Sequence, residues 1–192
     1  MVQLEELGLL KMDFLGLRTL TVLKDAVKNV KASKGIDINI DHIDLNDKKV
    51  LDFIGTGRTE GVFQLESGGM RLFLQNMKPS CFEDIIAAIS LYRPGPMESI
   101  PRYIAGKTDP STVHYETPLL RPILEVTYGC MVYQEQVMQI VRDLAGYSLG
   151  RSDLMRRAMA KKKRDVMAKE REYFIDGMTD EAGNVVIDGA VR

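Results

Sequence analysis

The sequence predicts a mostly α-helical protein with one short strand near its start. Glycine or proline separates most of the expected helices, and no internal repeat is present. The 45% hydrophobic and 28% charged residues are ordinary for a globular domain. Apolar side chains recur at the i, i+3, i+4, i+7 spacing of a buried helix face, most clearly at Val137, Ile140, Val141 and Leu144.

The chain is expected to open with one strand and one helix. Residues 8–15 (GLLKMDFL) alternate weakly between apolar and polar side chains, a pattern typical of a short strand. A helix should follow, capped by Thr19 or Thr21 and running to about Ser33. Gly35 comes next, and glycine suits a helix C-terminus because it adopts positive φ freely.

In the middle of the chain the sequence predicts short helices joined by turns. Residues 36–47 alternate apolar and acidic side chains, which indicates an extended or looped segment before a helix over residues 47–54. Another helix is expected over residues 70–77, after a pair of glycines. Ser80 and Glu83 have the Ser-x-x-Glu spacing of a capping box, which predicts that Ser80 caps the next helix.

The second half of the chain predicts a rigid turn, a loop-rich segment and two strong helices. Two prolines fix the backbone at residues 93–96 (RPGP) and oppose a helix before them. Residues 101–122 contain further prolines, so mainly loops are expected there. One helix is expected over residues 134–145, and a basic helix over residues 152–176 with Gly177 just past its end.

Basic charge is concentrated in one stretch, RSDLMRRAMAKKKRDVMAKER. The whole chain has a formal charge of −1, yet this stretch holds nine basic residues against three acidic ones. On one continuous helix Arg157, Lys161 and Arg164 would share a face, with Arg156 and Lys163 beside it. Such a row of cations suits a polyphosphate or a nucleic-acid backbone, and a solvated helix face is the simpler alternative. The nine residues are Arg151, Arg156, Arg157, Lys161, Lys162, Lys163, Arg164, Lys169 and Arg171.

Composition argues against several classes of protein. No apolar run reaches the ~18 residues that a membrane span needs, and no secretory signal pattern opens the chain. Cys81 and Cys130 are isolated thiols, which predicts reduced, packed cysteines and a cytoplasmic protein. Because His42 and His114 are the only histidines, a histidine-based metal or nucleophile site is not expected.

Outside the basic stretch, the candidate functional residues are isolated. Asp13 lies in the expected strand, where it is either a surface group beside Lys11 or one ligand of a divalent metal. A metal site for phosphoryl transfer needs two or more carboxylates, so the other ligands would lie elsewhere. Arg93 sits on the stiff RPGP turn, and Gln134 begins the following helix. Each has a simpler interpretation, as an exposed turn residue and as part of a helix start.

Several blocks match one protein family in the same order: KMDFLGLRTLTVL, GVFQLES-GGM, DIIAAISLYRPGP, TYGCMVYQEQVMQI and LAGYSLGRSDLMRRAMAKKK. Over nearly its whole length the chain resembles the catalytic α subunit of bacterial DNA polymerase III, in its DnaE-type branch. The resemblance implies that residues 1–35, a strand and a helix, end the polymerase palm. Residues 36–192 would be a helical fingers domain truncated at its C-terminus. The piece would then belong to a cytoplasmic replicative enzyme and be inactive alone.

The resemblance also implies roles for site residues. In this family a primer 3′-hydroxyl attacks the α-phosphate of a dNTP while carboxylates hold two Mg²⁺ ions. Asp13 would be a catalytic carboxylate and metal ligand. The residues implied to contact the nucleotide are Arg156 and Arg157, with Lys161 and Arg93 as further candidates. Those expected to contact nucleic acid are Lys162, Lys163 and Arg164. Partners would be primer-template DNA, dNTPs and other replisome subunits bound through regions absent here, with no membrane.

Two other functions fit the basic stretch. One is a non-enzymatic helical module that binds nucleic acid through residues 151–171, with an affinity governed by salt and no preference for a nucleoside triphosphate. The other is a protein-interaction domain whose basic helix meets an acidic partner. Neither explains why the strand aspartate, the RPGP turn and the arginine pair occur in this order.

Overall fold

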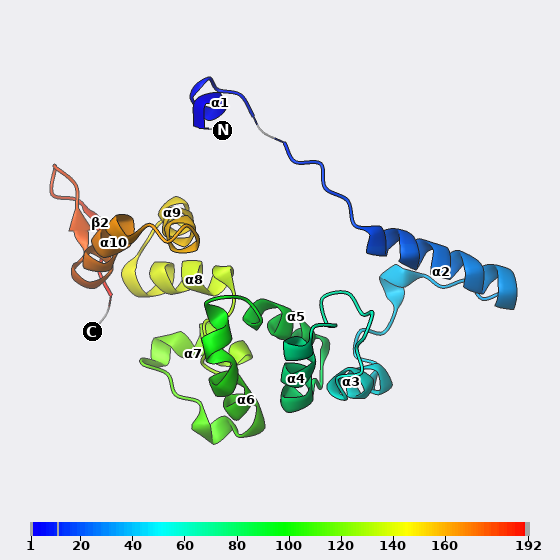
Figure 1. Ribbon diagram of the computed structural model, residues 1–192. Helices are drawn as coiled ribbons and strands as arrows, with labels where there is room; N and C mark the ends of the chain where they lie inside the picture. The colour runs from blue at the N-terminus through cyan, green and yellow to red at the C-terminus, as the bar shows by residue number, and fades with distance from the viewer. Residues whose placement is uncertain (1, 11, 191–192) are drawn as a thin grey trace. The chain divides into compact units, whose positions relative to one another are not determined.

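The computed structural model describes residues 2–10 and 12–190, coloured along the chain in Figure 1. The chain divides into two compact units, Met1–Leu45 and Asn46–Arg192, which are described separately. The mostly α-helical fold that the sequence predicts is confirmed. The first unit holds α1 (Val2–Glu6) and α2 (Arg18–Lys34). The longer helices of the second unit are α3 (Lys48–Gly55), α4 (Gly68–Met77), α5 (Phe82–Leu91), α6 (Ile100–Thr108), α8 (Gln134–Ala145), α9 (Leu149–Ala160) and α10 (Arg164–Asp176).

The strand expected over residues 8–15 is not formed where the chain is described, and Lys11 lies outside the described residues. Residues 9–10 and 12–17 have no regular secondary structure and lead to α2, as Figure 1 shows. A strand needs a neighbouring strand for its backbone N–H and C=O groups, and no described residue lies beside this segment as a strand partner. Weak alternation alone therefore does not produce a strand here.

Helix α2 begins two residues earlier than a cap at Thr19 would allow. Leu17 occupies the N-cap position without a side-chain hydrogen bond, so neither Thr19 nor Thr21 caps the helix. Gly35 ends the helix with a φ of 66°, as predicted. None of the residues of α2 is buried.

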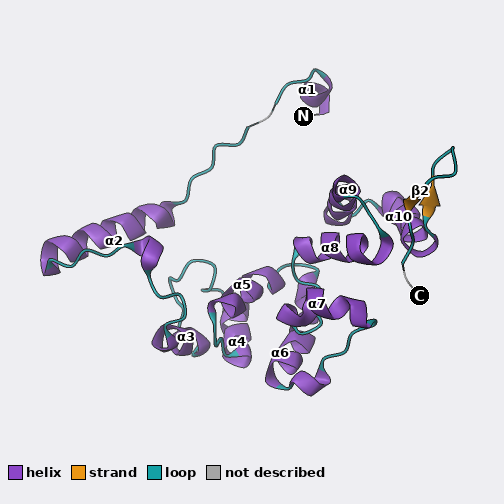
Figure 2. Cartoon of the chain, turned by 180° about the vertical axis from the view of Figure 1, so that it is seen from behind, coloured by secondary structure: helices purple, strands orange, loops and turns teal. Residues whose placement is uncertain are grey.

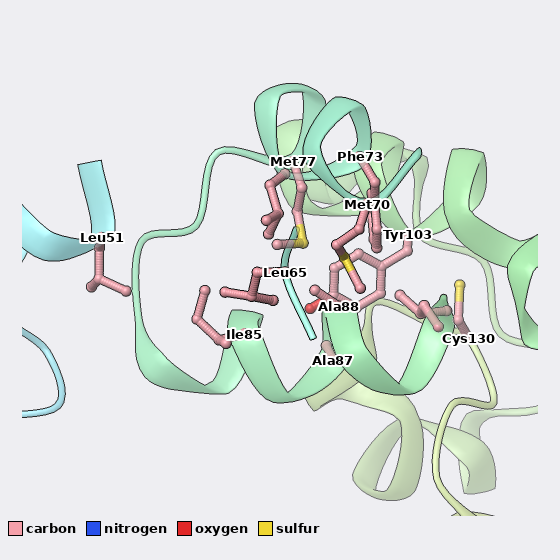
Figure 3. Close-up of a cluster of buried hydrophobic side chains, with 12 residues drawn as sticks. Leu51, Leu65, Met70, Phe73, Met77, Ile85, Ala87, Ala88, Tyr103 and Cys130 are labelled. Carbon is pink, nitrogen blue, oxygen red and sulfur yellow. The ribbon is translucent and has the colours of Figure 1, made fainter. Parts of the chain in front are cut away.

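The main core of the second unit forms among α3, α4, α5 and α6 (Figure 3). Leu74 of α4 and Leu91 of α5 are completely buried, and the ring of Tyr103 meets that of Tyr128 edge-on at 5.1 Å between centroids. Each large apolar side chain buried here contributes about 1.5–3 kcal/mol. The buried members are Leu51, Leu65, Met70, Phe73, Leu74, Met77, Ile85, Ala87, Ala88, Leu91, Tyr103 and Cys130.

Polar side chains start the helices that surround this core. Asp47 accepts a hydrogen bond from the backbone N–H of Lys49 at 2.8 Å, and so caps α3. Ser67 accepts one from the backbone N–H of Met70 at 3.3 Å, and α4 begins directly after it at the glycine pair. The helices predicted over residues 47–54 and 70–77 are therefore confirmed.

Helix α5 starts one residue later than predicted. Cys81, rather than Ser80, is its N-cap residue, and Asp84, rather than Glu83, completes the capping box. The carboxylate of Asp84 accepts hydrogen bonds from the backbone N–H groups of Ser80 at 2.7 Å and Cys81 at 3.3 Å. Lys107 of α6 donates to the same oxygen at 2.7 Å, and this tertiary contact favours Asp84 over its neighbour.

Residues 101–122 are more helical than predicted. Helix α6 includes Pro101 in its first turn, where the missing N–H would have had no intrahelical partner. Short 3₁₀ turns at Pro110–Thr112 and Pro118–Leu120 and the short helix α7 (Arg121–Leu124) follow. The expectation of loops is wrong because the prolines in this segment begin helical turns rather than interrupt them.

Helices α8, α9 and α10 pack around a second, smaller core. Val141, Ala145 and Tyr147 are buried there, and side chains of α9 and α10 pack against them. The helix predicted over residues 134–145 is confirmed as α8. After α10, the antiparallel strands β1 (Met178–Thr179) and β2 (Val185–Ile187) form the small sheet drawn in orange in Figure 2. No described helix is long and apolar enough to cross a membrane.

The basic stretch forms two helices, α9 and α10, instead of the single helix predicted. Lys162 adopts a φ of 51°. The N–H of Lys163 donates to the carbonyl of Ala158, and that of Lys162 to the carbonyl of Met159, both at 3.0 Å. These two bonds and the left-handed residue make a Schellman motif, which usually carries glycine where Lys162 stands. Gly177 follows α10 as predicted.

Candidate nucleotide and nucleic-acid interface

Arg156 and Arg157 of α9 share one carboxylate. Both Nε and Nη2 of Arg156 donate to Oδ1 of Asp153, at 2.9 Å and 2.7 Å. Nη2 of Arg157 forms an ion pair with the other oxygen, Oδ2. The i, i+3 and i, i+4 spacings place all three side chains on one side of the helix, so the arginines are held as a pair rather than as independent surface groups.

The two arginines differ in how firmly they are held. Nη1 of Arg156 donates to Oε1 of Gln134 at 2.8 Å, which ties α9 to the first residue of α8. Its side chain is only 27% exposed, whereas that of Arg157 is 61% exposed. Arg157 therefore presents most of its N–H donors to solvent, and Arg156 uses most of its donors within the protein.

The electrostatics of the cluster favour the charged form of the shared acid. The hydrogen bond from Arg156 lowers the pKa of Asp153, and the hydrogen bond from Arg157 and the charges of both arginines lower it further, against a smaller opposing effect of burial. Asp153 is consequently an anion at neutral pH. Two guanidinium groups beside one carboxylate leave a net positive charge that a phosphate can meet with bidentate hydrogen bonds.

Arg151 has an internal partner and does not belong to this pair. Its guanidinium donates to both carboxylate oxygens of Glu170 on α10, at 3.2 Å and 3.0 Å. It also stacks near the rings of Tyr147 and Tyr173, at 5.6 Å and 4.9 Å from their centroids. Arg151 therefore joins α9 to α10 and is not available as a cation for an external phosphate.

The turn between α9 and α10 gathers the remaining predicted contacts. All four side chains there are exposed, and none forms an ion pair with a described residue. The backbone reverses at Lys162, one residue after Lys161, whose N–H still donates to the carbonyl of Arg157 at 3.0 Å. Arg164 therefore does not continue the helix face of Arg157, and the predicted single row of cations is wrong. The four residues are Lys161, Lys162 and Lys163 in the turn and Arg164, which begins α10.

Next to this turn an open groove of about 470 Å³ runs between α9 and α10. Most of its lining side chains are apolar, and Arg164 and Arg171 of α10 also line it. Arg164 is thus set beside apolar surface, whereas the three lysines before it are surrounded by solvent. The lining residues are Met155, Arg164, Met167, Ala168, Arg171 and Phe174.

The other two candidates lie away from α9. Arg93 is exposed on the RPGP turn, where its carbonyl accepts a hydrogen bond from the N–H of Met97 at 3.1 Å. Gly95 in this turn has a φ of 108°, a conformation that other residues rarely adopt. Asp13 is exposed and belongs to the first compact unit, whereas Arg93, Arg156 and Arg157 belong to the second. Within residues 2–10 and 12–190 no three His, Cys, Asp or Glu side chains group as a metal site would require.

Sequence reasoning missed Asp153 as part of the site, although its signal was present. An acid three and four residues before two arginines on a helix is the spacing of intrahelical ion pairs. The two glutamines at the start of α8 have different roles. Gln136 stabilises the start of the helix, because its Oε1 accepts hydrogen bonds from the backbone N–H groups of Val132 and Tyr133 at 2.9 Å and 3.0 Å. Only the tertiary contact with Arg156 distinguishes Gln134 from this neighbour.

The sequence matches known proteins over most of its length. Residues 19–182 match the family described as "Bacterial DNA polymerase III alpha subunit finger domain". The chain is 51% identical over 177 residues to "DNA polymerase III subunit alpha" of Staphylococcus aureus (strain COL), covering 92% of this chain and 17% of that protein. It is 50% identical to the protein of the same name from Staphylococcus epidermidis (strain ATCC 12228 / FDA PCI 1200), again covering 92% of this chain and 17% of that protein.

The chain therefore spans 17% of the length of these curated relatives. The family match begins at the second residue of α2 and extends past α10, so it includes the arginine pair on α9 and the turn that follows it. Since the match extends over more than half of the sequence and ends within the β1–β2 connection, it includes nearly every described element. This chain belongs to the bacterial DNA polymerase III alpha subunit finger domain family.

Proposed function

We propose that this chain is the part of a replicative DNA-directed DNA polymerase that binds the incoming dNTP and contacts the template. The observation that carries the proposal is the arginine pair on α9, in which Asp153 holds Arg156 and Arg157 together and Arg157 stays 61% exposed. A nucleoside triphosphate carries a charge of about −4 at neutral pH, so it needs fixed cations, and arginine forks match phosphate oxygens bidentately.

In the proposed reaction a primer 3′-hydroxyl attacks the α-phosphate of the dNTP, and pyrophosphate leaves. Arg157 would bind the phosphates directly and counter the charge that develops as the bond to the leaving group breaks. Lys161 and Arg93 would make further nucleotide contacts. The exposed cations at the α9–α10 junction would bind the phosphates of nucleic acid, and they are Lys162, Lys163 and Arg164.

The described residues do not by themselves fit a site for Mg²⁺. Asp13 offers one carboxylate, and phosphoryl-transfer metals are held by two or more. We propose Asp13 as one ligand, with the others supplied by parts of the polymerase outside this chain. Residues 1–35 would accordingly end the palm and residues 36–192 form the truncated fingers domain. Other replisome subunits would bind elsewhere on the polymerase.

The proposal is tested by kinetics in a full-length subunit that carries this segment. Arg157→Ala and Arg156→Ala should each lower kcat/KM for the dNTP roughly 10- to 150-fold, since a lost charge-assisted contact costs about 1.5–3 kcal/mol. Affinity for primer-template should change far less, because many other cations hold the duplex. Lys169→Ala, exposed on α10, is the control and should leave both quantities nearly unchanged.

If the basic residues only bind nucleic acid and do not bind the dNTP, the opposite pattern of kinetic and binding effects is expected. All three substitutions would then weaken DNA binding to a similar degree, and each would lower the salt slope by about one unit. The dependence on dNTP would stay as it is in the unsubstituted protein. That result would refute the triphosphate assignment and leave the non-enzymatic module as the function of the basic residues.

A further inference from the structure

Asp153 lies at the centre of the arginine pair, and its two oxygens are divided between its neighbours. Oδ1 accepts two hydrogen bonds from Arg156, and Oδ2 pairs with Arg157. Arg156 is in turn fixed to α8 through Gln134. The contacts therefore run from Gln134 on α8 through Arg156 and Asp153 to Arg157. The side chains of Arg156 and Asp153 are each 27% exposed, whereas that of Arg157 is 61% exposed.

A flexible arginine loses rotamer freedom when it binds an anion, and this loss opposes binding in the productive orientation. An arginine already held by a carboxylate has lost part of that freedom before the ligand arrives. The carboxylate also separates two guanidinium groups that would otherwise repel each other. Both effects favour a single orientation of Arg157 in the free protein.

We infer that Asp153 is a positioning residue: anchored by Arg156 and Gln134, it aims Arg157 at the triphosphate of the incoming dNTP. This inference rests on the proposed function, in which Arg157 contacts the phosphates. It assigns different roles to the two arginines, because Arg156 acts mainly by holding Asp153, and Arg157 meets the ligand.

Asp153→Asn tests the inference with little change of shape. The single amide oxygen of Asn remains with Arg156, which makes two hydrogen bonds to that side and a third to Gln134. The amide NH₂ then faces Arg157, and two donors cannot pair, so Arg157 is released. Loss of orientation should lower kcat for dNTP incorporation by about 10- to 100-fold. KM for the dNTP should stay level or fall, since the site gains net positive charge.

A double-mutant cycle shows whether Asp153 acts through Arg157. In a full-length subunit that already carries Arg157→Ala, adding Asp153→Asn should change kcat less than about twofold, because the residue it positions is gone. Asp52→Asn is the matched control, as it breaks an exposed i, i+4 pair with Lys48 on α3 and should leave kcat unchanged. Thermal unfolding and primer-template affinity of each variant confirm that the fold is retained.

Each remaining outcome contradicts a specific statement. If Asp153→Asn lowers KM and leaves kcat intact, the carboxylate only competes with the triphosphate for Arg157, and the positioning role is wrong. If its effect adds fully to that of Arg157→Ala, Asp153 acts elsewhere, and the inference fails while the proposed function stands. If Arg157→Ala itself leaves dNTP kinetics unchanged, the proposed function fails, and this inference fails with it.

Discussion

At the scale of single residues, Asp84 shows how a buried charge can organise a helix start. Its side chain is 2% exposed, and Lys107, 12% exposed, lies 2.7 Å from it. Burial alone would raise the pKa of Asp84, but the hydrogen bond from Lys107, the backbone N–H of Ser80 and the charge of Lys107 together lower the pKa below its usual value. The ion pair is therefore maintained at neutral pH and joins α5 to α6.

Lys107→Met should destabilise the second unit by about 3–5 kcal/mol at neutral pH, because Asp84 would remain buried without its cation. The cost should shrink as the pH falls. A carboxyl group with a lowered pKa stabilises the fold above its unfolded pKa of about 3.9, and that contribution is lost as the pH drops through the folded pKa. Urea unfolding at neutral and acidic pH measures both effects.

Lys48→Met is the matched control for this substitution. It breaks the exposed pair with Asp52, whose side chains are 84% and 61% exposed, and it should cost less than about 1 kcal/mol at any pH. An equal effect of the two substitutions would show that the Asp84–Lys107 pair behaves like a surface pair and does not organise the junction of α5 and α6.

At the scale of elements, the break between α9 and α10 decides where the cations lie. The Schellman motif ends α9 at the lysine triplet and turns the chain, so the lysines form an exposed turn rather than a helix face. The left-handed conformation of Lys162, φ 51°, costs a residue with a Cβ roughly 1–2 kcal/mol, a cost that glycine avoids. The hydrogen bonds that close α9 offset this strain.

Lys162→Gly should raise the free energy of unfolding by about 1 kcal/mol, because glycine adopts positive φ without a steric clash. Lys161→Gly removes the same charge one position earlier, where φ is −87°, and should give no gain. Urea or thermal unfolding of both variants measures the difference. Equal stabilities of the two glycine variants would contradict a left-handed conformation at Lys162 and would support the single continuous helix that the sequence predicts.

At the scale of the whole molecule, the residues of the proposed function are divided between the two compact units. The chain carries the arginine pair and the cationic turn in its second unit and one candidate metal carboxylate, Asp13, in its first. It spans 17% of the length of its curated relatives. A two-metal reaction needs more than one carboxylate, so under the proposed function the other ligands would come from other parts of the polymerase.

The isolated 192-residue chain should therefore show no primer extension with a primer-template, Mg²⁺ and all four dNTPs. Gel analysis of the extended primer is the measurement, with an Asp13→Asn variant of the same chain prepared in parallel. Extension by the unsubstituted chain that the variant lacks would show that Asp13 and its neighbours suffice for catalysis. Extension by both preparations would point to a contaminating polymerase.

Local signals in the sequence were sufficient for most helices and for the arginine pair of the candidate site. Asp47 before α3, Gly146 after α8 and Gly177 after α10 are boundaries that capping chemistry sets within a few residues of the chain. The arginine pair also follows from sequence, because an acid three and four residues before two arginines on a helix can form ion pairs with both. These features depend on neighbours along the chain.

Tertiary structure decided the features that depend on contacts between residues far apart in the sequence. Lys107 selects Asp84 as the acid that caps α5, and no partner among the described residues turns residues 8–15 into a strand. A lysine in a left-handed conformation ends α9, although glycine normally marks such a position. The contact from Gln134 on α8 is what separates an anchored Arg156 from an exposed Arg157, because the sequence places both arginines next to Asp153 and cannot say which of them a second helix will hold.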